Sequence, residues 1–372
     1  MKIIWLILFL FPLNLVAQVT ISGTVTDANS NQPVPYTTIY INGTTNGTIT
    51  NSDGEFQLED VVPPCEIVFS HISYSPEAIV LQEAADKVFH IQLKPRDVEL
   101  EAVEVKDKNR RRENLRHFKE RFLGTDYWGE HAYFENDSVL IFHREKVTES
   151  EGYEHESGRL SGDSSSYWFV VNTKGPLIVQ KPLLGYKVHV NLIHYTELHT
   201  GSKEEYEFHT LGYFYFQPDE NASGRKTNRF RKKRLEAYYN SDRHFCRSLF
   251  QNRLKENGYY FFKWWTNPET LQRIDKEFPI ENYINRNENE AKIIGLKNKG
   301  FNIGYYQIFN APMNLKERRR EGRPEMSNIY FLKDTCTIRA DGSRPDNSIM
   351  FGPEIGKKRV GAMLPNDFQP KK

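Results

Sequence analysis

Hydrophobic and polar residues alternate over short runs along the N-terminal part of the chain, a pattern typical of β-strands. Ile21 and Val25 would share one face of the first strand, with Gly23 between them, where a side chain would crowd a neighbour. Residues 36–41 alternate with a period of two. Further strands are predicted around residues 56–58, 67–69, 79–81, 89–93 and 98–105.

Turn signals separate these strands at close spacing. They are the dipeptides Asn42-Gly43, Asn46-Gly47 and Asp53-Gly54, which supply the positive φ angles of tight hairpins. Since no helical periodicity interrupts them, we expect residues 18–106 to form an all-β sandwich of seven to eight antiparallel strands.

A helix is predicted next, from Asn114 to Leu123, because its apolar residues recur on one face and Gly124 can end it. The charged residues 110–113 are interpreted as a linker running into this helix, which makes residues 107–124 a linker and helix.

Strand and helix patterns both occur in residues 125–372, which predicts an α+β domain of mixed sheet and a few helices. One helix is expected around residues 235–239, and a second one capped by Ser241 and carrying Phe245 to Leu254, before Gly258. Strands are predicted around residues 139–141, 188–192, 210–218, 258–265, 303–306 and 329–332.

Residues 1–17 have the features of a secretory signal peptide: Lys2, an apolar run from Ile3 to Pro12, and Ala17 at the expected cleavage point. The run is shorter than the roughly 20 residues of a spanning helix, and no later segment reaches that length. No cysteine near Ala17 offers a lipid attachment site. We therefore expect an exported protein, periplasmic or associated with the outer membrane.

The net charge and the cysteine content further limit the class of protein to which this chain can belong. The formal net charge is +1, so no global field attracts nucleic acid. Cys65, Cys246 and Cys336 allow one disulfide at most, and their spacing matches no zinc motif. Buried free thiols are the expected state, with a disulfide left open.

The N-terminal residues resemble a known family. Gly23-x-Val25-x-Asp27, then Pro33 and Pro35, residues 41–56 and residues 71–76 are similar to the carboxypeptidase-regulatory-like domain of secreted proteins of the Bacteroidetes type. The resemblance implies a transthyretin-like β-sandwich, found on outer-membrane receptors and on envelope proteins. Residues 100–108 resemble the segment that leads into a receptor plug, but too few residues follow for a transport barrel.

The second half resembles a recurrent domain in the same group of envelope proteins. The similarity rests on residues 114–124, 176–188, 243–259 and 364–370, in that order. Residues 124–130 depart from it, since related chains often carry a cysteine there. The resemblance implies architecture and compartment, and it transfers no catalytic residue.

A zinc peptidase would require a His-x-x-Glu pair and a distant histidine. His117 with Glu120, and His194 with Glu197, have this spacing, which also arises by chance. The second pair is in a strand-like segment, where residues three apart point to opposite faces. Other catalytic and phosphate-binding motifs are missing. The sequence therefore predicts no catalytic, cofactor-binding or metal residue and no cofactor.

Two compositional features leave binding alternatives open. Basic clusters at residues 110–112, 229–234 and 318–320 with Arg323 are interpreted as solvated faces, with a contact to anionic lipid or lipopolysaccharide as the alternative. The aromatic run from Tyr259 to Trp265 is interpreted as core, with stacking on sugar rings as the alternative.

The leading functional interpretation is a non-catalytic cell-envelope protein whose sandwich is an accessory or docking module for an unidentified protein or glycan. Peripheral contact with the outer membrane is compatible with it. The competing interpretation is an envelope hydrolase, zinc-carboxypeptidase-like or other, with its site in the second domain. Histidines and carboxylates converging in a deep pocket of that domain would favour the hydrolase.

Overall fold

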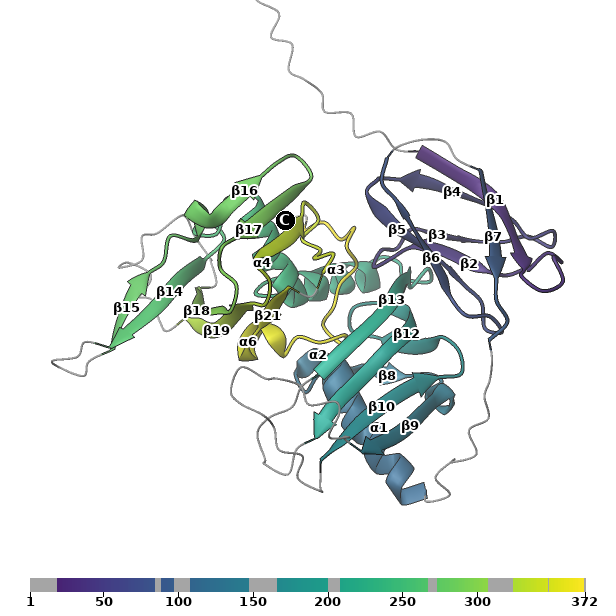
Figure 1. Cartoon of the computed structure of the whole chain (residues 1–372), viewed down its shortest axis with the longest axis horizontal. Helices are drawn as coiled ribbons and strands as arrows, with labels where there is room; N and C mark the ends of the chain where they lie inside the picture. Colours follow the sequence, from purple (N-terminus) through teal and green to yellow (C-terminus); the bar gives the residue numbers. More distant parts are fainter. Residues whose placement is uncertain are drawn as a thin grey trace, which may run out of the picture. The chain divides into compact units, whose positions relative to one another are not determined.

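The structure is a computed structural model (Figure 1). It describes residues 19–83, 88–96, 108–146, 166–199, 208–266, 273–306, 324–346 and 348–370. Two compact units make up the chain: residues 1–42 with 46–98, and residues 43–45 with 99–372. Among the described residues, no helix combines the length and apolarity needed to cross a membrane.

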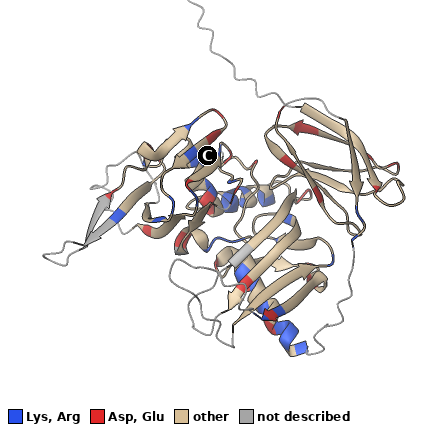
Figure 2. Ribbon diagram, in the orientation of Figure 1, with Lys and Arg blue, Asp and Glu red and all other residues tan. Residues whose placement is uncertain are grey.

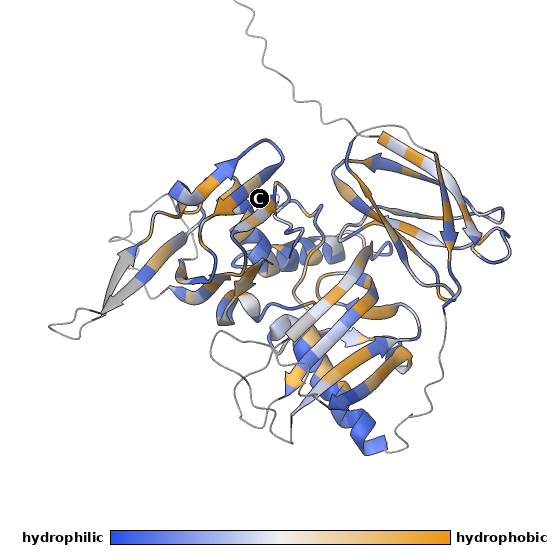
Figure 3. Ribbon diagram, viewed as in Figure 1, coloured by the Kyte–Doolittle hydropathy of each residue, from blue (hydrophilic) through white to orange (hydrophobic). Residues whose placement is uncertain are grey.

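The N-terminal unit is an all-β sandwich, as predicted. Its described strands are β1 (Val19–Asp27), β2 (Thr38–Ile41), β3 (Gly47–Ile49), β4 (Glu55–Val61), β5 (Cys65–Ser70), β6 (Glu77–Leu81) and β7 (Val88–Leu93). They form a sheet of order β4-β1-β7 and a sheet of order β3-β2-β5-β6. Hydrophobic and hydrophilic residues alternate along these strands (Figure 3). The apolar core between the sheets includes Ile21, Val25, Ile39, Phe56 and Phe69.

One strand pair differs from the antiparallel prediction, because β1 and β7 run parallel. A hairpin turn dictates antiparallel pairing of neighbours in sequence, but no turn dictates the direction of two strands so far apart in the chain. Gly23 lies at this pairing, where an added Cβ would come 2.0 Å from the carbonyl oxygen of Phe89. The crowding predicted at Gly23 is therefore confirmed.

The turn prediction is correct at two glycines and wrong at the third. Gly43 and Gly54 have φ angles of 76° and 73°. Gly47 is instead the first residue of β3, and its φ is not positive. The strand predicted at residues 98–105 lies outside the described residues.

The second unit begins with a helix packed against a sheet. The sheet contains β8 (Tyr133–Phe134), β9 (Leu140–Lys146), β10 (Tyr167–Thr173), β11 (Leu177–Lys181), β12 (Tyr186–His199) and β13 (Phe208–Pro218), in the order β8-β11-β12-β10-β9 with β13 on β12. Helix α1 (Lys108–Leu123) inserts Phe118, Phe122 and Leu123 into the core of this layer. Residues 110–113 are helical rather than a linker, because Arg111 donates to the carbonyls of Leu140 and Asp137 and so ties the first turn to the sheet edge.

Further helices are α2 (Tyr127–His131), α3 (Arg225–Tyr238), α4 (Asp242–Phe250) and α6 (Pro353–Gly356), and basic residues mark α1 and α3 (Figure 2). Ser241 caps α4 as predicted, its Oγ accepting from the amide of His244 at 3.1 Å. Leu254 is buried but lies beyond the end of α4, so the second helix is shorter than predicted.

A second core of the same unit lies around two further sheets. One has the order β15-β14-β18-β19-β21 and the other β16-β17-β20. Their strands are β14 (Tyr259–Thr266), β15 (Arg273–Glu277), β16 (Ile284–Arg286), β17 (Glu290–Ile294), β18 (Lys299–Tyr305), β19 (Glu325–Phe331), β20 (Thr335–Arg339) and β21 (Ile349–Phe351). Residues 259–262 of the aromatic run are all buried, on both faces of β14, which confirms the core interpretation for them.

Arg247 of α4 ties distant segments of this unit together. Its guanidinium donates to the carbonyl oxygens of Asp341, Asn366 and Phe368, each at 2.8 Å, and the residue is 5% exposed. The cysteines are free and buried, so the predicted thiol state is confirmed.

Candidate functional site

A cleft of about 450 Å³ opens in the second unit. It lies among α2, α3, the turn into α4, the ends of β18 and β19, and α6. Its lining residues are Asp126, Tyr127, Trp128, Lys232, Leu235, Glu236, Tyr239, Asn240, Tyr305, Glu325, Glu354, Lys357 and Lys358. A volume in this range suits a small-molecule ligand.

Aromatic rings form part of the cleft wall. Asp126 begins α2 as its N-cap, with its Oδ1 accepting from the amide of Gly129 at 2.9 Å. The cap fixes the first residues of the helix, where Tyr127 is 46% exposed and Trp128 is buried. Tyr239 is partly exposed. An exposed tyrosine in a cleft offers a flat apolar face together with a hydroxyl.

Charges in the cleft are nearly balanced, with four carboxylates and three ammonium groups among the lining residues. Lys357 pairs with Glu354, and Asn240 donates to Glu325. Lys358 donates to the carbonyl of Tyr239, and burial lowers the pKa of its ammonium to about 8. The cleft therefore offers many hydrogen-bonding groups and little net field, which fits a neutral hydroxyl-rich ligand better than an anion.

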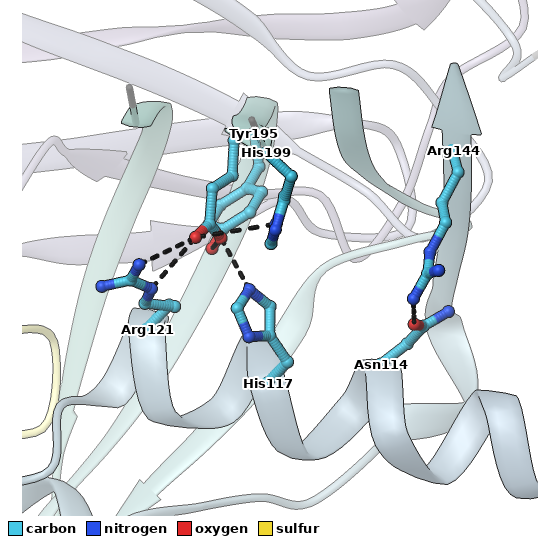
Figure 4. Close-up of polar contacts among 7 residues, drawn as sticks. Asn114, His117, Arg121, Arg144, Tyr195 and His199 are labelled. Carbon is cyan, nitrogen blue, oxygen red and sulfur yellow. Dashed lines mark hydrogen bonds and ion pairs between the residues drawn. The ribbon is translucent and has the colours of Figure 1, made fainter. Parts of the chain in front are cut away.

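A second candidate lies between α1 and β12, around the fully buried carboxylate of Glu197 (Figure 4). His117 Nε2 lies 2.8 Å from Glu197 Oε2, and Arg121 places Nε and Nη2 each 3.0 Å from Oε1. His199 Nε2 is 3.8 Å from Oε1, and the Tyr195 hydroxyl is 3.5 Å from Oε2. One ligand atom from each of His117, Glu197 and His199 lies within 4.8 Å of the others.

The surroundings shift the pKa values of this cluster. Burial raises the pKa of Glu197, but the hydrogen bond from His117 and the positive charge of Arg121 outweigh it and hold that pKa below its ordinary value. Burial lowers the pKa of His199, against the opposing effect of Glu197. Burial also raises the pKa of Tyr195, with Glu197 adding to the shift. Glu197 is therefore ionised at neutral pH inside the fold.

The histidines and glutamates of the two His-x-x-Glu pairs do not make the contacts that their spacing in the sequence would suggest. His117 contacts Glu197 instead of Glu120, which is on the helix surface beside Arg116. His194 is exposed and Glu197 buried, so they lie on opposite faces as expected. The informative spacing is Glu197-x-His199, because residues two apart in a strand share a face. Histidine and carboxylate do converge in this unit, but they do not line the cleft.

The basic residues singled out in the sequence differ in their surroundings. Arg234 of α3 donates to the carbonyls of Leu184 and Gly185 and lies 3.9 Å from the ring centre of Tyr186, so one member of the middle cluster supports the fold. Its neighbours Arg229, Arg231 and Lys232 are exposed. The cluster at residues 318–323 lies outside the described residues.

Comparison with known families adds one assignment. Residues 21–105 match the family model of the CarboxypepD_reg-like domain. The N-terminal unit is a CarboxypepD_reg-like domain. This confirms the resemblance for that part of the chain, and such a domain is compatible with a binding module. The resemblance of the second half and the Bacteroidetes origin stay predictions. No curated protein matches the chain.

Three solved structures are remotely similar to the chain that carries this CarboxypepD_reg-like domain. A mutant type II cohesin-X-dockerin complex from Acetivibrio cellulolyticus has 22% identity and a TM-score of 0.19, with 20% of this chain and 56% of that chain covered. A protein from Bacteroides uniformis, described as a candidate carbohydrate-binding protein, has 8% identity and a TM-score of 0.18, with 52% and 97% covered. A candidate membrane-associated protein of unknown function from Bacteroides fragilis has 12% identity and a TM-score of 0.18, with 54% and 95% covered.

Proposed function

We propose that this protein is an exported, non-catalytic cell-envelope protein that binds a neutral glycan in the cleft of its second unit. The observation that carries the proposal is the composition of that cleft, which combines aromatic rings with carboxylate, amide and ammonium groups of nearly balanced charge. Aromatic faces pack against the C–H faces of sugar rings, and the polar groups exchange hydrogen bonds with hydroxyls. A phosphorylated or nucleic-acid ligand would require an excess of positive charge instead.

The CarboxypepD_reg-like domain is proposed to act as an accessory or docking module, for a protein or for a further part of the same glycan. Its family assignment supports this role, as does the lack of a catalytic motif in the sequence. The features of residues 1–17 support export, to the periplasm or the outer membrane. Mild crosslinking in the native envelope followed by purification should recover a reproducible partner or glycan, and recovery of the chain alone would count against docking.

The sugar site can be tested with the full chain lacking residues 1–17, on an array of neutral oligosaccharides derived from cellulose, xylan, mannan and laminarin. For a bound oligosaccharide, Tyr127→Ala should weaken the affinity roughly tenfold, as expected for the loss of one stacking ring. Tyr133→Ala is the matched control, because Tyr133 is 49% exposed but lies outside the cleft.

Two results would contradict the proposal. One is that none of the arrayed oligosaccharides binds, and the other is that the two tyrosine variants lose affinity equally. Shortened oligosaccharides after incubation with the protein would instead favour the hydrolase over a non-catalytic role.

A further inference from the structure

We propose that His117, Glu197 and His199 bind a divalent transition-metal ion, with zinc the best fit. The proposal is independent of the glycan cleft, because none of the three residues lines it. Two imidazoles and one carboxylate are a ligand set that zinc accepts, whereas calcium and magnesium prefer oxygen ligands alone. The sequence predicted no metal residue, because the three ligands come from α1 and β12 and form no contiguous motif.

The ligand atoms are already close to the separations that zinc needs. With bonds of 2.0–2.1 Å, two ligands of a tetrahedral zinc lie about 3.3 Å apart. Here the Nε2 atom of His117 and Oε2 of Glu197 are 2.8 Å apart, and Nε2 of His199 is 3.8 Å from Oε1. The two distances go to different oxygens of Glu197, and the three ligand atoms together lie within 4.8 Å of one another, so the side chains must draw closer for all three to bind one ion. A fourth ligand must complete the tetrahedron.

Neighbouring rings hold both imidazoles in place. Tyr167 stacks on His199 with ring centres 4.7 Å apart and planes 3° apart. Phe169 meets the ring of His117 edge-on at 5.3 Å. Packing of this kind fixes ligand orientation before an ion arrives, which lowers the entropic cost of binding.

Arg121 sets the expected strength of the site. Its guanidinium holds Oε1 of Glu197 and leaves Oε2 toward His117. This orients the carboxylate as a ligand, but the positive charge of Arg121 also opposes a cation. We therefore expect weaker affinity than that of closed structural zinc sites. The His117 and His199 side chains are 33% and 17% exposed, but Nε2 of His199 is itself buried, so side chains around it must move for an ion to reach all three ligands.

The test uses the full chain lacking residues 1–17, without a histidine tag and treated with a chelator. Titration with cobalt(II) chloride should produce the visible absorption of a tetrahedral site, saturating at one equivalent, and zinc chloride should abolish it. His117→Gln and His199→Gln should each weaken cobalt binding at least 100-fold. His194→Gln should leave it unchanged, because His194 is exposed on the same strand and its ring contacts Thr196.

Circular dichroism of each variant confirms the fold, and the glutamine replacements retain a polar amide to protect it. The proposal is overturned if the wild-type chain shows no saturable cobalt absorption. It is equally overturned if folded His199→Gln binds as tightly as His194→Gln. A zinc-dependent rise of the melting temperature in the wild-type protein, and its loss in His199→Gln, is an independent readout of the same site.

Discussion

His244 illustrates how a single side chain can make the stability of the second unit depend on pH. The residue is 5% exposed, and its Nδ1 accepts from the amide of Asn240 at 3.2 Å and from the hydroxyl of Tyr259 at 3.0 Å. Burial lowers its pKa to about 3, with the charges of Lys358 and Arg247 adding to the effect. A buried imidazole close to positive charges resists protonation.

The sign of the pH effect follows from this pKa. Between pH 6.5 and about 3 the unfolded chain binds a proton that the folded chain does not, so acidification stabilises the unfolded state. From pH 7 to pH 5 the loss should be about 2 kcal/mol in the free energy of unfolding. Urea unfolding at pH 7 and pH 5 measures it, with His244→Gln as the comparison. An equal pH dependence in both proteins would show that His244 is not responsible.

The sequence singles out some residues of the candidate sites, but it does not show which of them contact one another. His117 and Glu197 are both visible in His-x-x-Glu pairs, yet each contacts the other and not its neighbour in sequence. Their contact depends on α1 crossing β12, and no local pattern encodes that crossing. Residues of the cleft come from five separate segments and have no shared motif, so only the fold brings them together.

At the scale of elements, the pairing of β1 with β7 requires a glycine at position 23. An added Cβ would meet the backbone of Phe89 on the parallel strand β7, and backbone cannot rotate away as a side chain can. Gly23→Ala should therefore lower the free energy of unfolding of the N-terminal unit by at least about 3 kcal/mol. Ser22→Ala is the control on the same strand. Equal stability of the two variants in urea would contradict the close approach.

Helices and strands with strong local sequence signals are predictable. The residues at which they begin and end, and the strands with which they pair, are less predictable. The helix ended by Gly124 and the Ser241 cap agree with the structure, because both depend on short-range hydrogen bonding and backbone angles. The parallel pairing of β1 with β7 and the helical state of residues 110–113 were missed, because contacts distant in sequence decide them.

At the scale of the whole molecule, the two compact units have separate cores, so we expect two unfolding transitions. Gly23→Ala should shift only the transition of the CarboxypepD_reg-like domain. Lowering the pH from 7 to 5 should shift the other one more strongly in the wild-type protein than in His244→Gln. Calorimetry of the full chain resolves both, and a single transition that responds to every change would contradict the expectation.

The contacts of the Arg247 guanidinium determine when, during synthesis, the second unit can complete its fold. The carbonyl oxygens it contacts lie between 94 and 121 residues later in the sequence. During synthesis, α4 therefore emerges long before its partners exist. The second unit is thus completed late in synthesis, and until then α4 carries a cation that must stay hydrated.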